Sequence, residues 1–305
     1  MSFSVHLPDV RDRARAAFLG LALGDALGAT VEFLTPSEIR ASHGVHRELV
    51  GGGWLYLKPG RVTDDTEMSL CIAQAISEQG GWSLRAIADR FSAWLRGRPT
   101  DAGNTCRIGI RNYINQGTLQ VQQSDWHAGN GAAMRMAPVA LYTLGDPALL
   151  EQLATEQAHV THNHPLSDIA CVLIGRLLHR AVLGCSLLRM REVADEVVAR
   201  QPNFAFEPYR GGATGYVVDT MQTVLHFFFA TRSFEECLVG VVNQGGDADT
   251  NGAIAGALAG AYYGLEELPS RWLKKLDPKI RAQIEPLTER LIALSPVGRG
   301  LEPQI

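Results

Sequence analysis

The chain has 305 residues, 46% of them hydrophobic and 20% charged, a balance that is typical of a folded globular protein and excludes a disordered chain. The formal net charge is −4, and basic residues are scattered apart from a short run at 271–275, so we expect no nucleic-acid-binding surface. Five cysteines without a C-x-x-C pair indicate reduced thiols, and the N-terminus lacks an apolar export core, so we expect a cytoplasmic protein.

Helical periodicity dominates the chain and predicts an all-α fold. The predicted helices span residues 10–28, 66–79, 84–96, 106–116, 131–143, 148–159, 165–183, 190–200, 214–230, 234–243, 250–263 and 278–294. Alternation typical of strands is nearly absent, and the best candidate strand is residues 55–57. No linker or repeat divides the sequence, so we predict one compact domain of orthogonally packed helices over residues 1–305.

Two predicted helices carry glycine at every fourth position. The first, in LGLALGDALGATVEFL, has Gly20, Gly24 and Gly28, and the second, in DTNGAIAGALAGAYYG, repeats the spacing from residue 252 to 264. Glycine at this spacing leaves one helix face without side chains, so we expect each helix to lie close to a neighbour. Asp25, inside the first helix, is expected to be a buried partner of a neighbouring loop.

Acidic residues precede two of the predicted helices. Asp64 and Asp65 follow a threonine in RVTDDTEM, and Asp247 and Asp249 precede a threonine in GGDADTNG. One short oxygen-bearing side chain is enough to cap a helix, and each cluster holds more than one. Capping therefore remains an alternative, but it does not explain why the oxygen-bearing residues are clustered. Glu32, at the end of the first glycine-rich segment, is a third acidic position that helix packing could bring to the same place.

Convergence of these five carboxylates in one pocket would require cations. Their mutual repulsion would keep several of them protonated unless divalent ions neutralise them. Both motifs offer oxygen ligands without His or Cys, which favours Mg²⁺ or Mn²⁺. Four or five carboxylates exceed the needs of one such ion, so we predict a pair of ions about 4 Å apart, with threonine hydroxyls completing the coordination.

The segment WHAGNGAAMRMAPVAL contains a glycine-bearing turn that we expect to open a helix. Backbone N–H groups at Gly129, Asn130 and Gly131 would attract phosphate, and Arg135 could assist. A plain loop-to-helix turn is the alternative.

Two further segments contain candidate ligands. HVTHNHPLSD holds His159, His162 and His164, which we expect to be loop histidines, one of them reaching a ligand; a zinc site is the weaker alternative. Asp101, between two predicted helices, has the position of a turn or N-cap residue.

Together, GDALGATVEFL, VTDDTEMSL, HAGNGAAMR, THNHP and NQGGDADTNGAIAGALAGA occur in an order that resembles the ADP-ribosylglycohydrolase family. The resemblance runs from about residue 13 to residue 264 and beyond. It implies an all-α fold whose cleft binds two Mg²⁺ or Mn²⁺ ions, and hydrolysis of the glycosidic bond that joins ADP-ribose to a protein side chain.

The family's functional residues carry over by motif. The resemblance implies metal ligation by Thr63, Asp64, Asp65, Asp247, Asp249 and Thr250. It implies a catalytic role for Asp101, as acid or base, with Glu32 and Asp64 in the same site. It implies diphosphate binding by Gly129, Asn130, Gly131 and Ala132, and ribose contacts by His162 and Tyr216.

The most similar members also imply a substrate and partners. They act on an ADP-ribosylated arginine of the nitrogenase iron protein (dinitrogenase reductase), and are sequestered at the membrane through a PII-type signal protein and an ammonium channel. Asn104, Cys106 and Asn251 depart from the pattern expected of these members, and leave substrate preference open. The alternatives are hydrolysis of a serine or acetyl-ester linkage, phosphohydrolysis, or ADP-ribose binding without catalysis.

Overall fold

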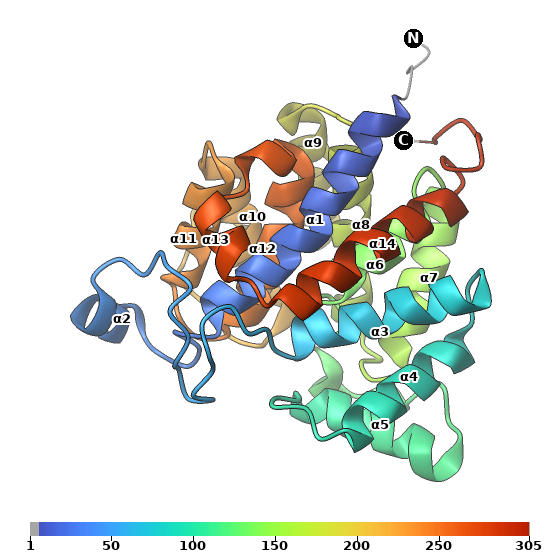
Figure 1. Cartoon of the computed structure of the whole chain (residues 1–305), viewed down its shortest axis with the longest axis horizontal. Coiled ribbons are helices and arrows are strands. Elements are labelled where there is room, and N and C mark those ends of the chain that lie inside the picture. The colour runs from blue at the N-terminus through green and yellow to red at the C-terminus, as the bar shows by residue number, and fades with distance from the viewer. Residues whose placement is uncertain (1–5, 305) are drawn as a thin grey trace.

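The computed structural model describes residues 6–304 and confirms the all-α class, since these residues contain no β-strand (Figure 1). Its longer helices are α1 (Leu7–Gly28), α3 (Asp64–Gln79), α4 (Leu84–Arg96), α5 (Asn104–Gln116), α7 (Pro147–His159), α8 (Pro165–Val182), α9 (Leu187–Arg200), α10 (Val217–Ala230), α11 (Phe234–Val242), α12 (Ala248–Tyr263) and α14 (Pro278–Leu294). The shorter ones are α2 (Pro36–His43), α6 (Met136–Tyr142), α13 (Ser270–Lys275) and the 3-10 turns η1 (Asp125–His127), η2 (Pro202–Phe204) and η3 (Leu265–Glu267). The predicted domain, residues 1–305, includes residues 1–5 and 305, which lie outside the described part.

Two short helices, α2 and α13, were not predicted. Helix α2 begins with a capping box, in which the Thr35 hydroxyl accepts from the Glu38 amide and the Glu38 carboxylate accepts from the Thr35 amide. This T-x-x-E signal was present in the sequence, but α2 is too short for periodicity to reveal it. The best candidate strand, residues 55–57, is not a strand, because a tight turn closed by backbone pairing of Gly52 with Leu57 occupies this stretch.

The predicted helix at residues 131–143 begins later than expected, at Met136. Residues 131–135 form turns, in which the carbonyl of Asn130 accepts from the amides of Ala133 and Met134. Pro138 lies in the first turn of α6, where its missing amide hydrogen is tolerated, and this position fits a helix that begins at Met136. The glycine turn therefore does not open a helix directly.

The most extensive helix pairing joins α1 to α12 through their glycine faces. Gly20 faces Gly256, and Gly24 faces Gly252, so the two backbones touch without intervening side chains. A Cβ atom added at Gly24 would lie 1.9 Å from the Gly252 carbonyl oxygen. The predicted close approach is thus confirmed, and the two glycine-rich helices are each other's neighbours.

The pairing is antiparallel, which fixes where the helix ends lie. Contacts proceed from Gly20 with Gly256 to Gly28 with Ala248, so the C-terminal end of α1 meets the N-terminal end of α12. Figure 1 shows the two helices side by side at the centre of the molecule. The acidic residues that follow α1 and those at the start of α12 are therefore brought close together.

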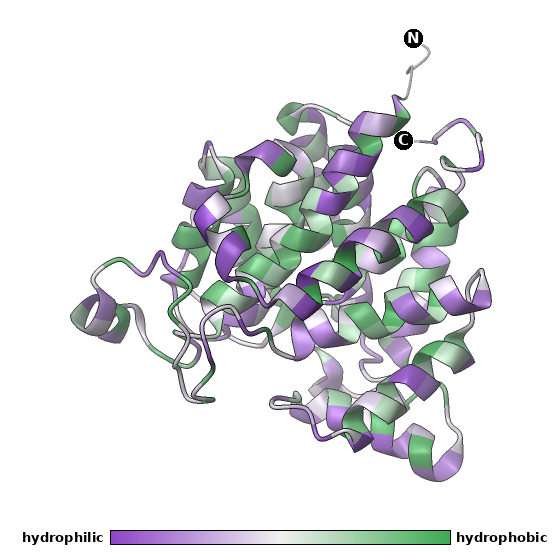
Figure 2. Ribbon diagram, viewed as in Figure 1, coloured by the Kyte–Doolittle hydropathy of each residue, from purple (hydrophilic) through white to green (hydrophobic). Residues whose placement is uncertain are grey.

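The surrounding helices bury an apolar core around this pair. Figure 2 shows α12 as largely hydrophobic, whereas outer helices such as α14 carry a hydrophilic face. All five cysteines are buried and free, as expected. Across residues 6–304, no helix combines the length and apolarity that crossing a bilayer would require.

We predict that Gly24→Ala lowers the free energy of unfolding by about 3 kcal/mol or more, because the added methyl group overlaps the backbone of α12. Gly81→Ala is the matched control, since the nearest atom to its added Cβ would lie 3.8 Å away, and its effect should stay within about 1 kcal/mol. Urea unfolding followed by circular dichroism measures both. Equal midpoints for the two variants would contradict the close helix contact.

Candidate active site

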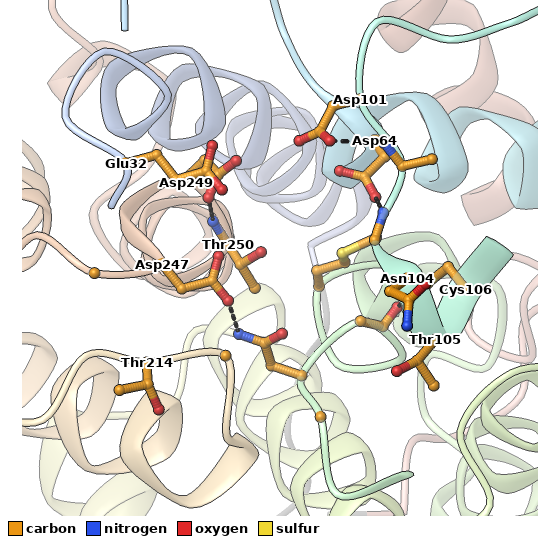
Figure 3. Close-up of a pocket in the computed structure, with 18 of the residues that line it drawn as sticks. Glu32, Asp64, Asp101, Asn104, Thr105, Cys106, Thr214, Asp247, Asp249 and Thr250 are labelled. Carbon is orange, nitrogen blue, oxygen red and sulfur yellow. Dashed lines mark hydrogen bonds between the residues drawn. The ribbon is translucent and has the colours of Figure 1, made fainter. Parts of the chain in front are cut away.

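Three carboxylates meet where α1 ends and α12 begins. Glu32 lies in the turn after α1, Asp247 is the N-cap residue of α12, and Asp249 lies in its first turn. One carboxylate oxygen from each lies within 4.8 Å of the others (Figure 3). The turn is fixed by backbone hydrogen bonds, since the Phe33 amide donates to the Gly246 carbonyl at 2.6 Å.

Asp25 attaches the start of α3 to the same place. Its carboxylate accepts hydrogen bonds from the backbone amides and the hydroxyl groups of Thr63 and Thr66. This confirms the expected buried partner role of Asp25. Asp25 of α1 thus fixes the N-terminal end of α3, so Asp64 and Asp65 lie near the carboxylates of α12. The Thr63 hydroxyl lies 3.5 Å from Asp249 Oδ2.

Asp64 and Asp101 lie on the other side of the pocket from Glu32, Asp247 and Asp249 (Figure 3). Asp64 Oδ2 accepts from the Gly103 amide at 2.9 Å, which ties the loop before α5 to the start of α3. Asp101 Oδ1 accepts from the Ala102 amide at 2.7 Å. The loop thus holds a carboxylate facing the acidic cluster of α12.

These groups line a cavity of about 600 Å³. Of the predicted site residues, the cavity is lined by Glu32, Asp64, Asp101, Gly129, Asn130, Gly131, His162, Asp247, Asp249 and Thr250. Four others, Thr63, Asp65, Ala132 and Tyr216, are not among its lining residues. Thr63, Asp65 and Ala132 are buried, whereas Tyr216 is 42% exposed and pairs through its backbone with Gly129.

The glycine turn contacts the acidic cluster directly. The Asn130 side-chain amide donates to Asp247 Oδ2 at 2.6 Å and to the Thr220 hydroxyl at 2.9 Å. Gly131 permits the approach of His162, because an added Cβ would lie 2.8 Å from the imidazole ring. The turn and the acids therefore form one continuous surface.

The pocket shifts the acidity of its carboxyl groups. Burial raises the pKa of Glu32 to about 8 and that of Asp64 to about 7, with neighbouring carboxylates adding to both effects. Burial and nearby acids raise the pKa values of Asp65 and Asp249 well above their usual range. The common cause is crowding of like charges away from water, which a positive ion would relieve.

The donor set fits a hard divalent cation. The acidic groups on α3 and α12 offer only oxygen, and Glu32, Asp247 and Asp249 form the one group of three or more candidate acidic, His or Cys ligands found within residues 6–304. Asp65 Oδ1 is buried without a hydrogen-bond partner. An orphaned carboxylate oxygen in this position is a ligand atom that a cation would satisfy.

Arg135, which we expected could assist phosphate binding, does not line the cavity. Its guanidinium is fully buried, donates to Gln157 and Thr161, and lies over the Phe91 ring at 4.9 Å. The side chain therefore points into the core, where the side chains of Gln157 and Thr161 satisfy it.

The three histidines have separate roles, and the zinc alternative is not supported. His159 pairs with Asp168 at 3.0 Å, and His164 caps α8 by accepting from the Leu166 amide. Of the three, only His162 lines the pocket, and its contact with a ligand stays a prediction. Burial lowers its pKa well below the usual value, which keeps the ring neutral.

Sequence reasoning missed Trp54 and Phe33, which line the cavity beside Glu32. The Trp54 indole N–H donates to Glu32 Oε2 at 2.5 Å. The only sequence signal was the GGGWL stretch, in which positive φ angles at residues 51–53 turn the chain back toward α1.

Comparison with known proteins decides the family. The family model described as ADP-ribosylglycohydrolase matches residues 6–300. The chain belongs to the ADP-ribosylglycohydrolase family. It is therefore a hydrolase of this family, as predicted.

Individual relatives agree with this assignment. The chain is 54% identical to "ADP-ribosyl-[dinitrogen reductase] glycohydrolase" of Rhodospirillum rubrum, over 94% of this chain and 98% of that protein. It is 30% identical to "ADP-ribosylarginine hydrolase Tri1" of Serratia proteamaculans, over 93% and 80% of the two chains. A solved structure described as an "ADP-ribosylglycohydrolase-related protein complex" superposes with a TM-score of 0.83 at 34% identity, covering 94% of this chain and 99% of that one.

We predict that Asp25→Asn lowers the free energy of unfolding by about 1–3 kcal/mol, because an amide nitrogen would face the N–H donors of Thr63 or Thr66. Asp168→Asn is the control, since this partly exposed residue pairs with His159 and an amide oxygen can still accept there. Urea unfolding compares the two variants. An Asp25 variant as stable as the control would show that this carboxylate does not anchor α3.

Proposed function

We propose that this ADP-ribosylglycohydrolase removes ADP-ribose from an arginine side chain of a protein, and that the protein is the nitrogenase iron protein. The observation that carries the proposal is the convergence of carboxylates from α3 and α12 on one cavity, in a chain that is 54% identical to a relative named for dinitrogen reductase. The second relative is named for ADP-ribosylarginine, which supports the same linkage.

The acidic groups would hold two divalent cations, Mn²⁺ or Mg²⁺. The proposed ligands are Thr63, Asp64, Asp65, Asp247, Asp249 and Thr250, grouped at the N-terminal ends of α3 and α12. When bound, such ions orient the ribose hydroxyl groups and lower the pKa of water. Thr63 and Asp65 are buried and do not line the cavity, so they would bind the cations from the buried side of the acidic cluster.

Proton transfer is assigned to Asp101. It lines the cavity across from Glu32, and burial raises its pKa, which brings a carboxyl group closer to proton exchange at neutral pH. As an acid it would donate a proton to the departing guanidine nitrogen, and as a base it would accept one from the attacking water. With cations bound nearby to favour their ionised forms, Glu32 and Asp64 would add negative charge where the sugar carbon becomes positive during bond cleavage.

The remaining predicted residues would hold the nucleotide part of the substrate. The turn Gly129, Asn130, Gly131 and Ala132 is proposed to bind the diphosphate, with Ala132 acting through its backbone because its side chain is buried. Neutral His162 and the exposed ring of Tyr216 are proposed to contact ribose. Both lie next to the turn, since His162 approaches Gly131 and Tyr216 pairs with Gly129.

Location and control are proposed by analogy with the relatives. We infer a cytoplasmic enzyme that is recruited peripherally to the membrane through a PII-type signal protein and an ammonium channel. These partners remain predictions, supported by the resemblance alone.

We predict that the purified protein with Mn²⁺ releases ADP-ribose from ADP-ribosylated nitrogenase iron protein and from free ADP-ribosylarginine. Mass spectrometry of the iron protein and chromatography of released ADP-ribose measure this. Serine-linked and acetyl-linked ADP-ribose should react at least about tenfold more slowly, if the site discriminates by the leaving group.

Controls separate the alternatives. Asp247→Ala removes an acidic group from the cluster and should abolish release while the fold survives. Faster release from the serine or ester linkage would replace the proposed substrate class. Binding of ADP-ribose without release from any conjugate would identify a non-catalytic relative.

A further inference from the structure

Two aromatic rings flank the cavity next to its acidic cluster. Phe33 and Trp54 both line the cavity, and their ring centroids lie 5.4 Å apart at an interplanar angle of 50°. Phe33 is 64% exposed and Trp54 is 48% exposed. Exposure of one aromatic residue is common on a protein surface, but here two neighbouring rings leave apolar surface in water beside a polar pocket.

Both rings are held in place by the backbone. Phe33 has φ of 64°, a left-handed conformation that is uncommon for a bulky residue, and its amide donates to the Gly246 carbonyl. Trp54 lies in the turn closed by Gly52 and Leu57, and its indole N–H is bonded to Glu32. The fold therefore places both residues at the cavity, with a strained backbone at Phe33 and a hydrogen bond that orients the Trp54 indole.

The pair abuts the reacting end of the cavity. Phe33 follows Glu32 directly in the chain, and Trp54 contacts the Glu32 carboxylate, which in turn lies within 4.8 Å of Asp247 and Asp249. The bond to be cleaved must lie at these carboxylates if they promote its hydrolysis. A group just beyond that bond, on the side that leaves, would reach the two aromatic rings.

We propose that Phe33 and Trp54 form a binding site for the guanidinium group of the substrate arginine. This inference rests on the proposed function and names the feature that would select an arginine linkage. A guanidinium is planar and cationic, and it stacks favourably on aromatic faces. A serine hydroxyl has neither the plane nor the charge, and an acetyl group is planar but uncharged.

Electrostatics of the surroundings favour the same occupant. The Glu32 carboxyl group lies at the N–H edge of the Trp54 indole, and Asp64, Asp101, Asp247 and Asp249 line the same cavity. Among the residues that line the cavity there is no Arg or Lys to compete for the rings. A cation arriving at this entrance would therefore meet two aromatic rings next to acidic groups, with no fixed positive side chain among the lining residues.

Phe33→Leu tests the proposal, because leucine keeps apolar bulk and removes the π face, whereas Trp54 variants would also release Glu32. We expect kcat/KM for free ADP-ribosylarginine to fall by about two- to thirtyfold. The dissociation constant for ADP-ribose, which lacks the guanidinium, should stay within about twofold of wild type by calorimetry. Phe33→Tyr retains the ring and should restore kcat/KM.

Tyr56→Leu is the matched control, since this aromatic residue is 90% exposed two positions from Trp54 but does not line the cavity. It should leave both measurements unchanged. An unchanged kcat/KM in Phe33→Leu would overturn the proposal, and so would weaker binding of ADP-ribose, which would assign the rings to the nucleotide. A wild-type enzyme that releases no ADP-ribose from the arginine conjugate would instead defeat the proposed function itself, and this inference with it.

Discussion

Direct backbone contact between α1 and α12 is the constraint on which the site depends. Only glycine permits the spacing at positions such as Gly24 and Gly252, and the antiparallel direction then brings the end of one helix to the start of the other. Asp25, on the same stretch of α1, holds the start of α3 through Thr63 and Thr66. Three helix ends are thus fixed relative to one another within a rigid core, and each carries acidic groups.

This arrangement is unfavourable for the polypeptide alone. Burial and mutual repulsion raise the pKa values of the acidic groups, so the metal-free pocket favours protonated carboxyls. The rigid glycine contact keeps the acids from separating to relieve the repulsion. The site is therefore prepared for positive charge, which the cations would supply in the interior and the substrate guanidinium at the aromatic entrance.

Many of the residues that line the cavity could be predicted because they belong to short contiguous motifs. Repeated glycine spacing predicted helix contact, and the acidic clusters predicted a shared pocket, since both patterns are local. What could not be predicted depends on details of tertiary packing. Arg135 lies in the core, where Gln157 and Thr161 accept its hydrogen bonds, and Trp54 reaches Glu32 because three residues of positive φ fold its turn back onto α1. Neither effect follows from the periodicity of the sequence.

Anomalous diffraction from crystals grown with Mn²⁺ tests most directly whether the converging acids form a metal centre. Data collected at the manganese absorption edge locate each ion without reference to the chain. We expect two peaks about 4 Å apart, lying between the N-terminal ends of α3 and α12 and within reach of Asp64, Asp65, Asp247 and Asp249. A map with no peak in this cavity, or with manganese bound only at the outer surface, would contradict the claim that these acids form a metal centre.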